Sequence, residues 1–283
     1  MRSSVLSLAI AASIALASAP VLADAPKCEP EKVAEKYPEL AGKTLLMGAD
    51  GQTPPYAYLD SKTNTLVGSD IDLAKKVFDC IGVKYEIRPA AWSGLFPAVV
   101  AGQMDLMYYL YYNQKRAQQG DFIVYMKAGT GALTQKGNPK NIKSQDDLCG
   151  KTVAVGLGSV EEAQMKELGG KCVAAGKETV NVMTYSDHAA GFRLIANNRA
   201  DIMLTDLALV DRTVVDNPTV YERAYGIIGS FQIGVAVKKG NKPLEDAILE
   251  GLKAVQASGG EQEVFKKYGV DPALELPAEL KTN

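Results

Sequence analysis

Short apolar runs alternate with helical patterns along this chain of 283 residues, and this alternation constrains the fold more than any other feature. Residues 44–49 and 84–88 are apolar runs of strand length. Residues 70–81 and 93–101 place apolar side chains at helical spacing, and a glycine follows each segment. The order strand, helix, strand is typical of a largely parallel α/β sheet.

The second half of the chain repeats this design, with expected strands at 151–156 and 180–185 and expected helices at 159–168 and 187–197. The segment GLFPAVVAGQMDLM (94–107) also resembles GFRLIANNRADIM (191–203). Two similar lobes would leave a cleft between them, and ligands of open α/β sheets bind beyond the carboxyl ends of strands. The alternative is that α/β units merely look alike.

A third block contains an expected strand at 231–237 and helical patterns at 243–257 and 261–268. A chain that leaves the first lobe near Gly129 and returns near Gly229 would explain this block. We therefore expect two lobes, each built on a mixed, mostly parallel sheet. The expected boundaries are 24–128 for lobe 1, 129–228 for lobe 2 and 229–283 for the return to lobe 1.

The first residues form a separate segment. Arg2 precedes a short run rich in alanine and serine, and Ala23 and Ala25 offer alternative cleavage sites. This pattern is typical of a secretory signal peptide, which we assign to residues 1–23. A membrane anchor is the alternative, but the run is shorter than the ~20 apolar residues that a spanning helix needs.

Export changes the interpretation of the four cysteines, because an even number of them in an oxidising compartment favours disulfides. Three pairings are possible. Cys149 and Cys172 flank one strand–helix unit, so we prefer Cys149–Cys172 together with Cys28–Cys80. A zinc site is the rival interpretation, but the chain has no Cys-x-x-Cys pair and one histidine, His188. We therefore expect no metal site and treat His188 as an ordinary residue near a helix start.

The charge balance excludes some partners. The chain has 31 Lys+Arg and 33 Asp+Glu residues, for a net charge of −2. It shows no basic patch of the kind that binds nucleic acid or anionic lipid.

Tyrosines crowd one short stretch, DLMYYLYYNQKR (105–116), where a buried strand runs out. Because strands alternate their faces, Tyr109 and Tyr111 should share one side, and Tyr108 should share the other with Leu110. Burying three phenols in a core would require a partner for each hydroxyl. We therefore expect at least two of Tyr108, Tyr109, Tyr111 and Trp92 to line the cleft.

The sequence resembles a known family, the periplasmic solute-binding proteins of amino-acid-type ABC importers (bacterial extracellular solute-binding proteins, family 3). The resemblance covers about Leu45 to Val270. It is carried by the order and spacing of PPYAY, LVGSDIDLAKKVF, WSGLFPAVVAGQMDLM, KRAQQGDFIVYMKAGT, IKSQDDLCGKTVAVGLGSVEE, NNRADIMLTD and FQIGVAVKKGNKPLEDAILEGLKAV. It implies a two-lobed type II binding-protein fold, in which two crossing strands join the two sheets. It also implies periplasmic location, a monomer without cofactor, and transient docking on an inner-membrane permease.

The resemblance also implies a set of ligand contacts. Arg116 matches an arginine that holds a ligand carboxylate, which suits its planar guanidinium, and Asp206 matches an acid that takes a ligand ammonium or caps a helix. The turn at Gly158, Ser159 and Val160 would present backbone N–H groups to the carboxylate. The remaining expected contacts are Trp92, which stacks on the ligand or packs in the core, and Asp50 and Thr53, which contact the ligand side chain.

The chain departs from the family pattern where it carries Tyr108, Tyr109 and Tyr111, because these positions commonly hold small residues. Thr53 replaces a common aromatic residue, and Val160 replaces a frequent threonine. These rings favour a ligand with a flat face or a diffuse positive charge.

Two other functions remain open. Periplasmic dehydratases that act on prephenate or arogenate resemble this family, and Asp50 or Asp206 could serve in acid–base chemistry. We expect no enzyme, because fold alone does not give function and the sequence shows no catalytic triad or phosphate loop. The third interpretation is a sensor or accessory protein that binds a solute without importing it.

Overall fold

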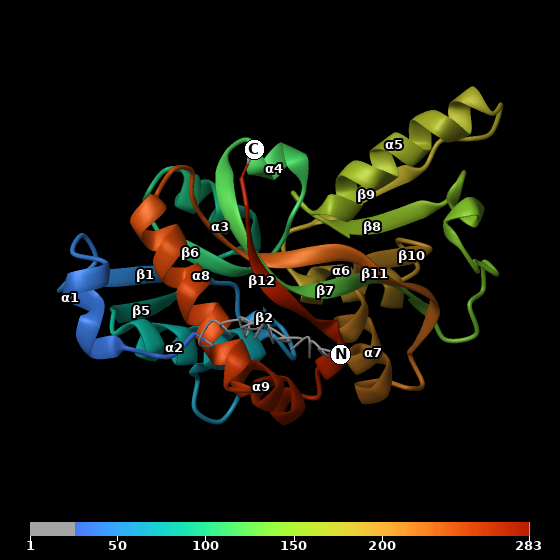
Figure 1. Cartoon of the computed structure of the whole chain (residues 1–283). Coiled ribbons are helices and arrows are strands. Elements are labelled where there is room, and N and C mark those ends of the chain that lie inside the picture. Colours follow the sequence, from blue (N-terminus) through green and yellow to red (C-terminus); the bar gives the residue numbers. More distant parts are fainter. Residues whose placement is uncertain (1–25, 283) are drawn as a thin grey trace, which may run out of the picture.

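Two long antiparallel strands, β7 (Gly120–Gln135) and β11 (Tyr221–Lys238), run through the centre of the molecule (Figure 1). The computed structural model describes residues 26–282, apart from the side chains of residues 228 and 230. The expected signal peptide lies outside the described residues. The expected lobe boundaries near residues 128 and 228 fall inside these two strands, which connect the lobes.

Three parallel strands flank the central pair in each lobe. Lobe 1 contains β1 (Thr44–Ala49), β5 (Lys84–Pro89) and β6 (Leu106–Tyr111), and lobe 2 contains β8 (Thr152–Gly156), β9 (Asn181–Tyr185) and β10 (Ile202–Asp206). The hydrogen-bonded order is β5-β1-β6-β11-β7-β10-β8-β9, so one mixed sheet continues through both lobes. The carboxyl ends of β1, β6, β9 and β10 therefore supply residues to one region between the lobes.

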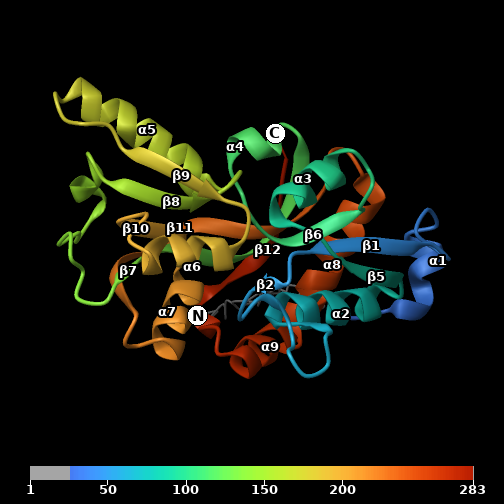
Figure 2. The same ribbon diagram turned by 180° about the vertical axis from the view of Figure 1, so that it is seen from behind.

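Helices cover both faces of this sheet. In lobe 1 these are α2 (Ser69–Ile81), α3 (Trp92–Val100), α8 (Lys242–Ala257) and α9 (Gly260–Tyr268), and in lobe 2 they are α5 (Val160–Ala174), α6 (His188–Ala196) and α7 (Leu207–Asp216). Figure 1 shows α8 in front of the sheet, and the reverse view in Figure 2 shows α3 and α6 on the other side. Separate apolar clusters lie under α3 and α8, and under α5 and α6.

Shorter elements complete the fold. A small sheet contains β2 (Gln52–Thr53), β3 (Ala57–Leu59) and β4 (Leu66–Val67), and the short helices are η1 (Pro30–Lys32), α1 (Val33–Lys36), α4 (Gln114–Ala117), η2 (Gln145–Leu148) and η3 (Pro272–Leu274). A final strand, β12 (Glu275–Lys281), pairs with β7. The sequence patterns did not predict β12, which contains a proline and few apolar residues.

Two disulfides join distant parts of each lobe. Cys28 is bonded to Cys80 at the end of α2, and Cys149 is bonded to Cys172 near the end of α5. These are the two preferred pairs.

The expected alternation of the tyrosines in β6 is confirmed for Tyr109 and Tyr111, which pack in one cluster with ring centroids 6.0 Å apart, but it is wrong for Tyr108. Tyr108 packs in the same cluster as Tyr111, whereas Leu110 packs on the opposite face under α3. The reason is a bulge. The pairing of β6 with β11 shifts its register at this point, and Tyr109 has a left-handed backbone with φ of 57°. One extra residue in a strand resets which face the following side chains share.

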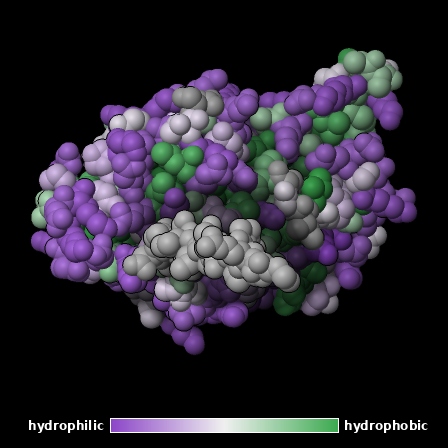
Figure 3. Space-filling model, viewed as in Figure 1, coloured by the Kyte–Doolittle hydropathy of each residue, from purple (hydrophilic) through white to green (hydrophobic). Residues whose placement is uncertain are grey.

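The outer surface seen in Figure 3 is mainly polar, with apolar side chains gathered in limited patches. Within residues 26–282, no helix combines the length and the hydrophobicity needed to cross a membrane.

Candidate ligand-binding site

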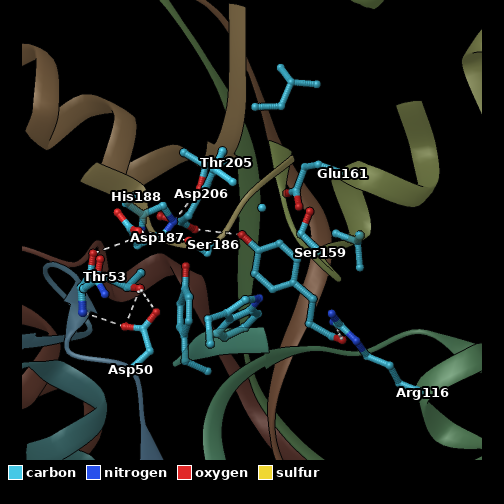
Figure 4. Close-up of a pocket in the computed structure, with 18 residues that line it drawn as sticks. Asp50, Thr53, Arg116, Ser159, Glu161, Ser186, Asp187, His188, Thr205 and Asp206 are labelled. Carbon is cyan, nitrogen blue, oxygen red and sulfur yellow. Dashed lines mark hydrogen bonds between the residues drawn. The ribbon is translucent and has the colours of Figure 1, made fainter. Parts of the chain in front are cut away.

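A cavity lies between the two lobes and has a volume of about 670 Å³, including space open to solvent (Figure 4). Lobe 1 contributes the loop after β1, the start of α3, the end of β6 and α4. Lobe 2 contributes the starts of α5 and α6 and the carboxyl end of β10. Nine of the expected contacts line it: Asp50, Thr53, Trp92, Tyr109, Tyr111, Arg116, Ser159, Val160 and Asp206.

Two expected residues do not line this cavity. Gly158 faces a neighbouring groove, although its carbonyl oxygen accepts a hydrogen bond from Arg116 at 3.0 Å. Tyr108 is buried beneath the site, where its ring lies 5.8 Å from that of Tyr125. The bulge at Tyr109 turns Tyr108 toward the core of lobe 1.

Arg116 lies on α4, directly after the tyrosine-rich strand. Its backbone N–H donates to the side chain of Asn113, which caps this helix. Its guanidinium donates to the carbonyl of Tyr111 at 2.7 Å and to that of Gly158 in lobe 2. Burial lowers the pKa of Arg116 to about 10. The charge of Glu161 raises this pKa. Among the described residues no carboxylate forms an ion pair with Arg116, and its guanidinium donates to carbonyl oxygens, so it remains available to an anion.

Asp206 ends β10 and caps α7. One carboxylate oxygen accepts from the backbone N–H groups of Ala208 and Leu209, and the other accepts from the hydroxyl of Tyr111 at 3.0 Å. Burial raises the pKa of Asp206, and these hydrogen bonds act in the opposite direction. The helix-cap alternative is therefore realised, and the same carboxylate also faces the cavity.

The start of α5 carries the turn that was expected to meet a carboxylate. Ser159 caps the helix by accepting from the backbone N–H of Glu162 at 3.2 Å. The side chain of Glu162 reaches back to the N–H of Gly158 at 2.6 Å. The backbone at Ser159 and Val160 thus meets the cavity at the positive end of a helix of 15 residues.

His188 lies at a helix start, as expected, but it is not the ordinary residue that the sequence indicated. It begins α6 and lines the cavity. Its Nδ1 lies 3.1 Å from the carbonyl oxygen of Gln52 in lobe 1, and its Nε2 lies 3.3 Å from the hydroxyl of Thr205. Since a carbonyl only accepts, Nδ1 carries the proton and His188 bridges the lobes. Burial lowers the pKa of His188, and the nearby carboxylate of Asp50 raises it.

Asp50 follows β1 and shapes the lobe 1 wall. Its carboxylate accepts from the N–H of Gln52 at 2.7 Å and from the hydroxyl of Thr53 at 3.1 Å. Burial raises the pKa of Asp50.

Sequence reasoning missed nine lining residues: Gln52, Gly156, Glu161, Tyr185, Ser186, Asp187, His188, Leu204 and Thr205. The rule that placed Asp206 after β10 would also have found residues 185–188, because they follow the carboxyl end of β9. Glu161 had no such signal, since an acidic residue in the first turn of a helix is common.

No group of three or more metal-ligating side chains gathers within residues 26–282. The chemistry of the cavity is that of one guanidinium, several carboxylates, hydroxyls and aromatic rings, which suits recognition of a small polar molecule.

Comparison with known proteins identifies the family. Residues 45–271 match the model of the bacterial extracellular solute-binding proteins, family 3. The chain belongs to this family. It is 29% identical over 232 residues to the L-cystine-binding protein TcyJ of Escherichia coli (strain K12), covering 81% of this chain and 84% of that protein. It is 28% identical to an L-glutamate/L-aspartate-binding protein of Pseudomonas aeruginosa, covering 95% of this chain and 88% of that protein.

Solved structures agree with this assignment. An ancestral arginine-binding protein bound to arginine is 31% identical and superposes with a TM-score of 0.72, covering 80% of this chain and 97% of that chain. The ancestral amino acid-binding protein AncCDT-1, described as a precursor of cyclohexadienyl dehydratase, is 28% identical with a TM-score of 0.68, covering 84% and 98%. The fold is that of the periplasmic binding proteins.

Proposed function

We propose that this protein is the periplasmic solute-binding component of an ABC importer. It captures a small amino-acid-like, or aromatic or cationic, organic solute by closure of its lobes and delivers it to an inner-membrane permease. The protein acts as a monomer, and its signal peptide is removed after Ala23 or Ala25. Family membership and the cavity between the lobes support this proposal.

The observation that carries the proposal is the guanidinium of Arg116. It is largely buried at the cleft, contacts both lobes, donates to carbonyl oxygens and forms no ion pair within the described chain. A ligand carboxylate would supply the missing negative charge and would meet the helix start at Ser159 at the same time. Asp206, across the cavity, would take a ligand ammonium together with the hydroxyl of Tyr111.

The test begins with a thermal-shift screen of amino acids, betaines, amines and aromatic acids, followed by calorimetry on every compound that stabilises the protein. Arg116→Ala should weaken binding of a carboxylate ligand by at least about tenfold, because a charged partner is lost at a desolvated site. Arg88→Ala is the matched control, since Arg88 is exposed and paired with Glu86 outside the cavity. Unchanged affinity in Arg116→Ala would remove this arginine from the site.

A dehydratase-like enzyme is the second candidate, because AncCDT-1 is a structural neighbour and the cavity holds the carboxyl groups of Asp50 and Asp206. NMR of each bound compound after long incubation distinguishes the two. A binding protein returns its ligand unchanged, whereas conversion that Asp206→Asn abolishes would establish an enzyme.

A further inference from the structure

Glu161 is a buried acid that faces the cavity and forms no ion pair, although its charge interacts with that of Arg116. It is the second residue of α5, and its side chain is only 4% exposed. One carboxylate oxygen accepts from the hydroxyl of Thr130 at 3.1 Å, and Ser159 supplies a second hydroxyl donor. Within the described residues no Lys, Arg or His forms an ion pair with it. Its own backbone N–H is a third donor. A buried carboxyl group without an ion pair is costly to ionise, and burial accordingly raises the pKa of Glu161.

The other acids of the cavity already have local structural roles. Asp206 caps α7, and Asp187 caps α6 by accepting from the N–H of Ala190 at 2.7 Å. Asp50 holds the turn of its own loop through Gln52. Glu161 caps no helix and closes no turn, so its orientation toward the cavity needs another explanation.

The cavity as a whole has an excess of acidic groups. Its walls include four carboxyl groups, those of Asp50, Glu161, Asp187 and Asp206, and a single guanidinium, that of Arg116. Burial lowers the pKa of His188, so its imidazole adds little positive charge at neutral pH. A ligand carboxylate on Arg116 would cancel the one permanent positive charge of these walls. A ligand that carried a net positive charge would therefore be favoured over a zwitterion with none.

Aromatic rings line the same space. Trp92, Tyr109, Tyr111 and Tyr185 contribute to the walls, and a cation over such faces is attracted further. Figure 4 shows Glu161 and Asp206 reaching toward the cavity from separate elements of lobe 2, with Arg116 on the lobe 1 side. The site can thus hold one anionic and two cationic groups of a single ligand.

We propose that Glu161 determines specificity by binding a cationic side group of the ligand, so that the transported class is carboxylates with an additional ammonium or guanidinium group. This inference depends on the proposed function, because it describes the same cleft. A local carboxylate at that position would discriminate between ligands that differ in one charge.

The experiment uses two pairs of ligands with nearly the same shape. L-arginine and L-citrulline differ in a guanidinium against a neutral ureido group, and L-lysine and L-norleucine differ in a terminal ammonium. Binding of each is measured by calorimetry at low ionic strength to the full mature protein, to Glu161→Gln and to Glu167→Gln. Glu167 is the matched control, because it lies on the same helix but is exposed and paired with Lys171.

The wild type and Glu167→Gln should bind the charged member of a pair at least about tenfold more tightly than its neutral partner, and Glu161→Gln should remove most of that preference. Equal affinity for the two members of both pairs, or a preference that survives in Glu161→Gln, would overturn the inference. If L-glutamine binds while neither charged probe does, the inference fails and the proposed function stands. If the thermal-shift screen yields no ligand at all, the proposed function fails first.

Discussion

Tyr111 connects the two lobes through a single hydroxyl. It belongs to β6 of lobe 1, but its hydroxyl donates to Asp206 of lobe 2. Its ring stacks on Phe231 of the crossing strand β11, with centroids 4.9 Å apart. Tyr111 thus packs against a strand that joins the lobes and donates a hydrogen bond across the cleft, so it would link ligand contact to the proposed closure of the lobes.

We predict that Tyr111→Phe weakens ligand binding by about fivefold to thirtyfold, because a buried carboxylate loses a donor at a cost of roughly 1–2 kcal/mol. Calorimetry against the identified ligand measures the change. Tyr112→Phe is the control, since this neighbouring ring packs under α3 on the other face. Equal losses in both variants would show a general packing effect instead.

The titration of His188 can be used to follow closure of the lobes, because the sequence contains one histidine and its signal is unambiguous. Its environment includes Asp50, Asp187, Asp206 and Thr205 as well as the carbonyl of Gln52. Burial has the largest effect and lowers its pKa below the ordinary value of 6.5. A group with a lowered pKa binds a proton less readily in the closed form, so acidification opposes closure.

We therefore predict that the imidazole of tag-free, ligand-bound protein titrates below 6.5 in an NMR experiment, and that the value rises when the ligand is removed. Ligand affinity should fall as the pH decreases through this range, and His188→Gln should reduce that dependence. A bound-state pKa above 6.5 would mean that the surrounding carboxylates outweigh burial.

At the scale of elements, each disulfide joins a peripheral segment of a lobe to a helix of the same lobe. Cys28–Cys80 joins the start of the described chain to the end of α2, with a sequence separation of 52 residues. Cys149–Cys172 joins the segment after η2 to α5, with a separation of 23 residues. Each bond lies within a single lobe, so the disulfides stabilise the two lobes without restricting the proposed closure.

Replacing both cysteines of a pair by serine should lower the free energy of unfolding by ~4 kcal/mol for Cys28–Cys80 and ~3.5 kcal/mol for Cys149–Cys172, because the longer loop loses more entropy when it is closed. Urea unfolding measures both. Peptide mapping without reduction should recover these two pairs from periplasmic material. Four free thiols there would contradict the prediction.

At the scale of the whole molecule, lobe 1 buries two carboxylic acids whose ionisation lowers the stability of the folded state near neutral pH. Asp70 on α2 accepts from the hydroxyl of Tyr125 at 2.5 Å, and burial raises its pKa to about 7. Glu261 on α9 accepts from Gln256 at 2.6 Å, and burial raises its pKa to about 8. The folded state favours the neutral form of both acids. Their stabilising contribution is therefore complete below about pH 4 and is lost as the pH rises through the raised pKa values of the folded state.

We predict that the protein is less stable at pH 8 than at pH 5, with each of these acids contributing up to ~1.4 kcal/mol for every pH unit above its unfolded pKa and below its folded one. Asp70→Asn and Glu261→Gln should each flatten the pH dependence of the melting temperature. Asp79→Asn, on the exposed side of α2, should leave it unchanged. Parallel pH profiles for all variants would contradict this assignment.

Local patterns in the sequence predicted most of the fold, because hydrophobic periodicity and glycine stops are properties of neighbouring residues. The expected helices at 93–101 and 187–197 appear as α3 and α6 with ends shifted by one residue. The expected strand at 231–237 is part of the much longer β11, since its first half lacks a clear apolar pattern. The strand β12 was missed because its stability comes from pairing with β7 rather than from its own side chains.

The sequence by itself determined the alternating α/β order and favoured the two cysteine pairs that form, and together with its family resemblance it indicated nine of the residues that line the cavity. Only the tertiary structure decided the orientation of Tyr108, the bridge made by His188 and the position of Glu161 facing the cavity. Each of these depends on the register of β6 against β11 or on how one lobe meets the other. Such contacts join residues far apart in the chain, and no local pattern specifies the geometry in which they meet.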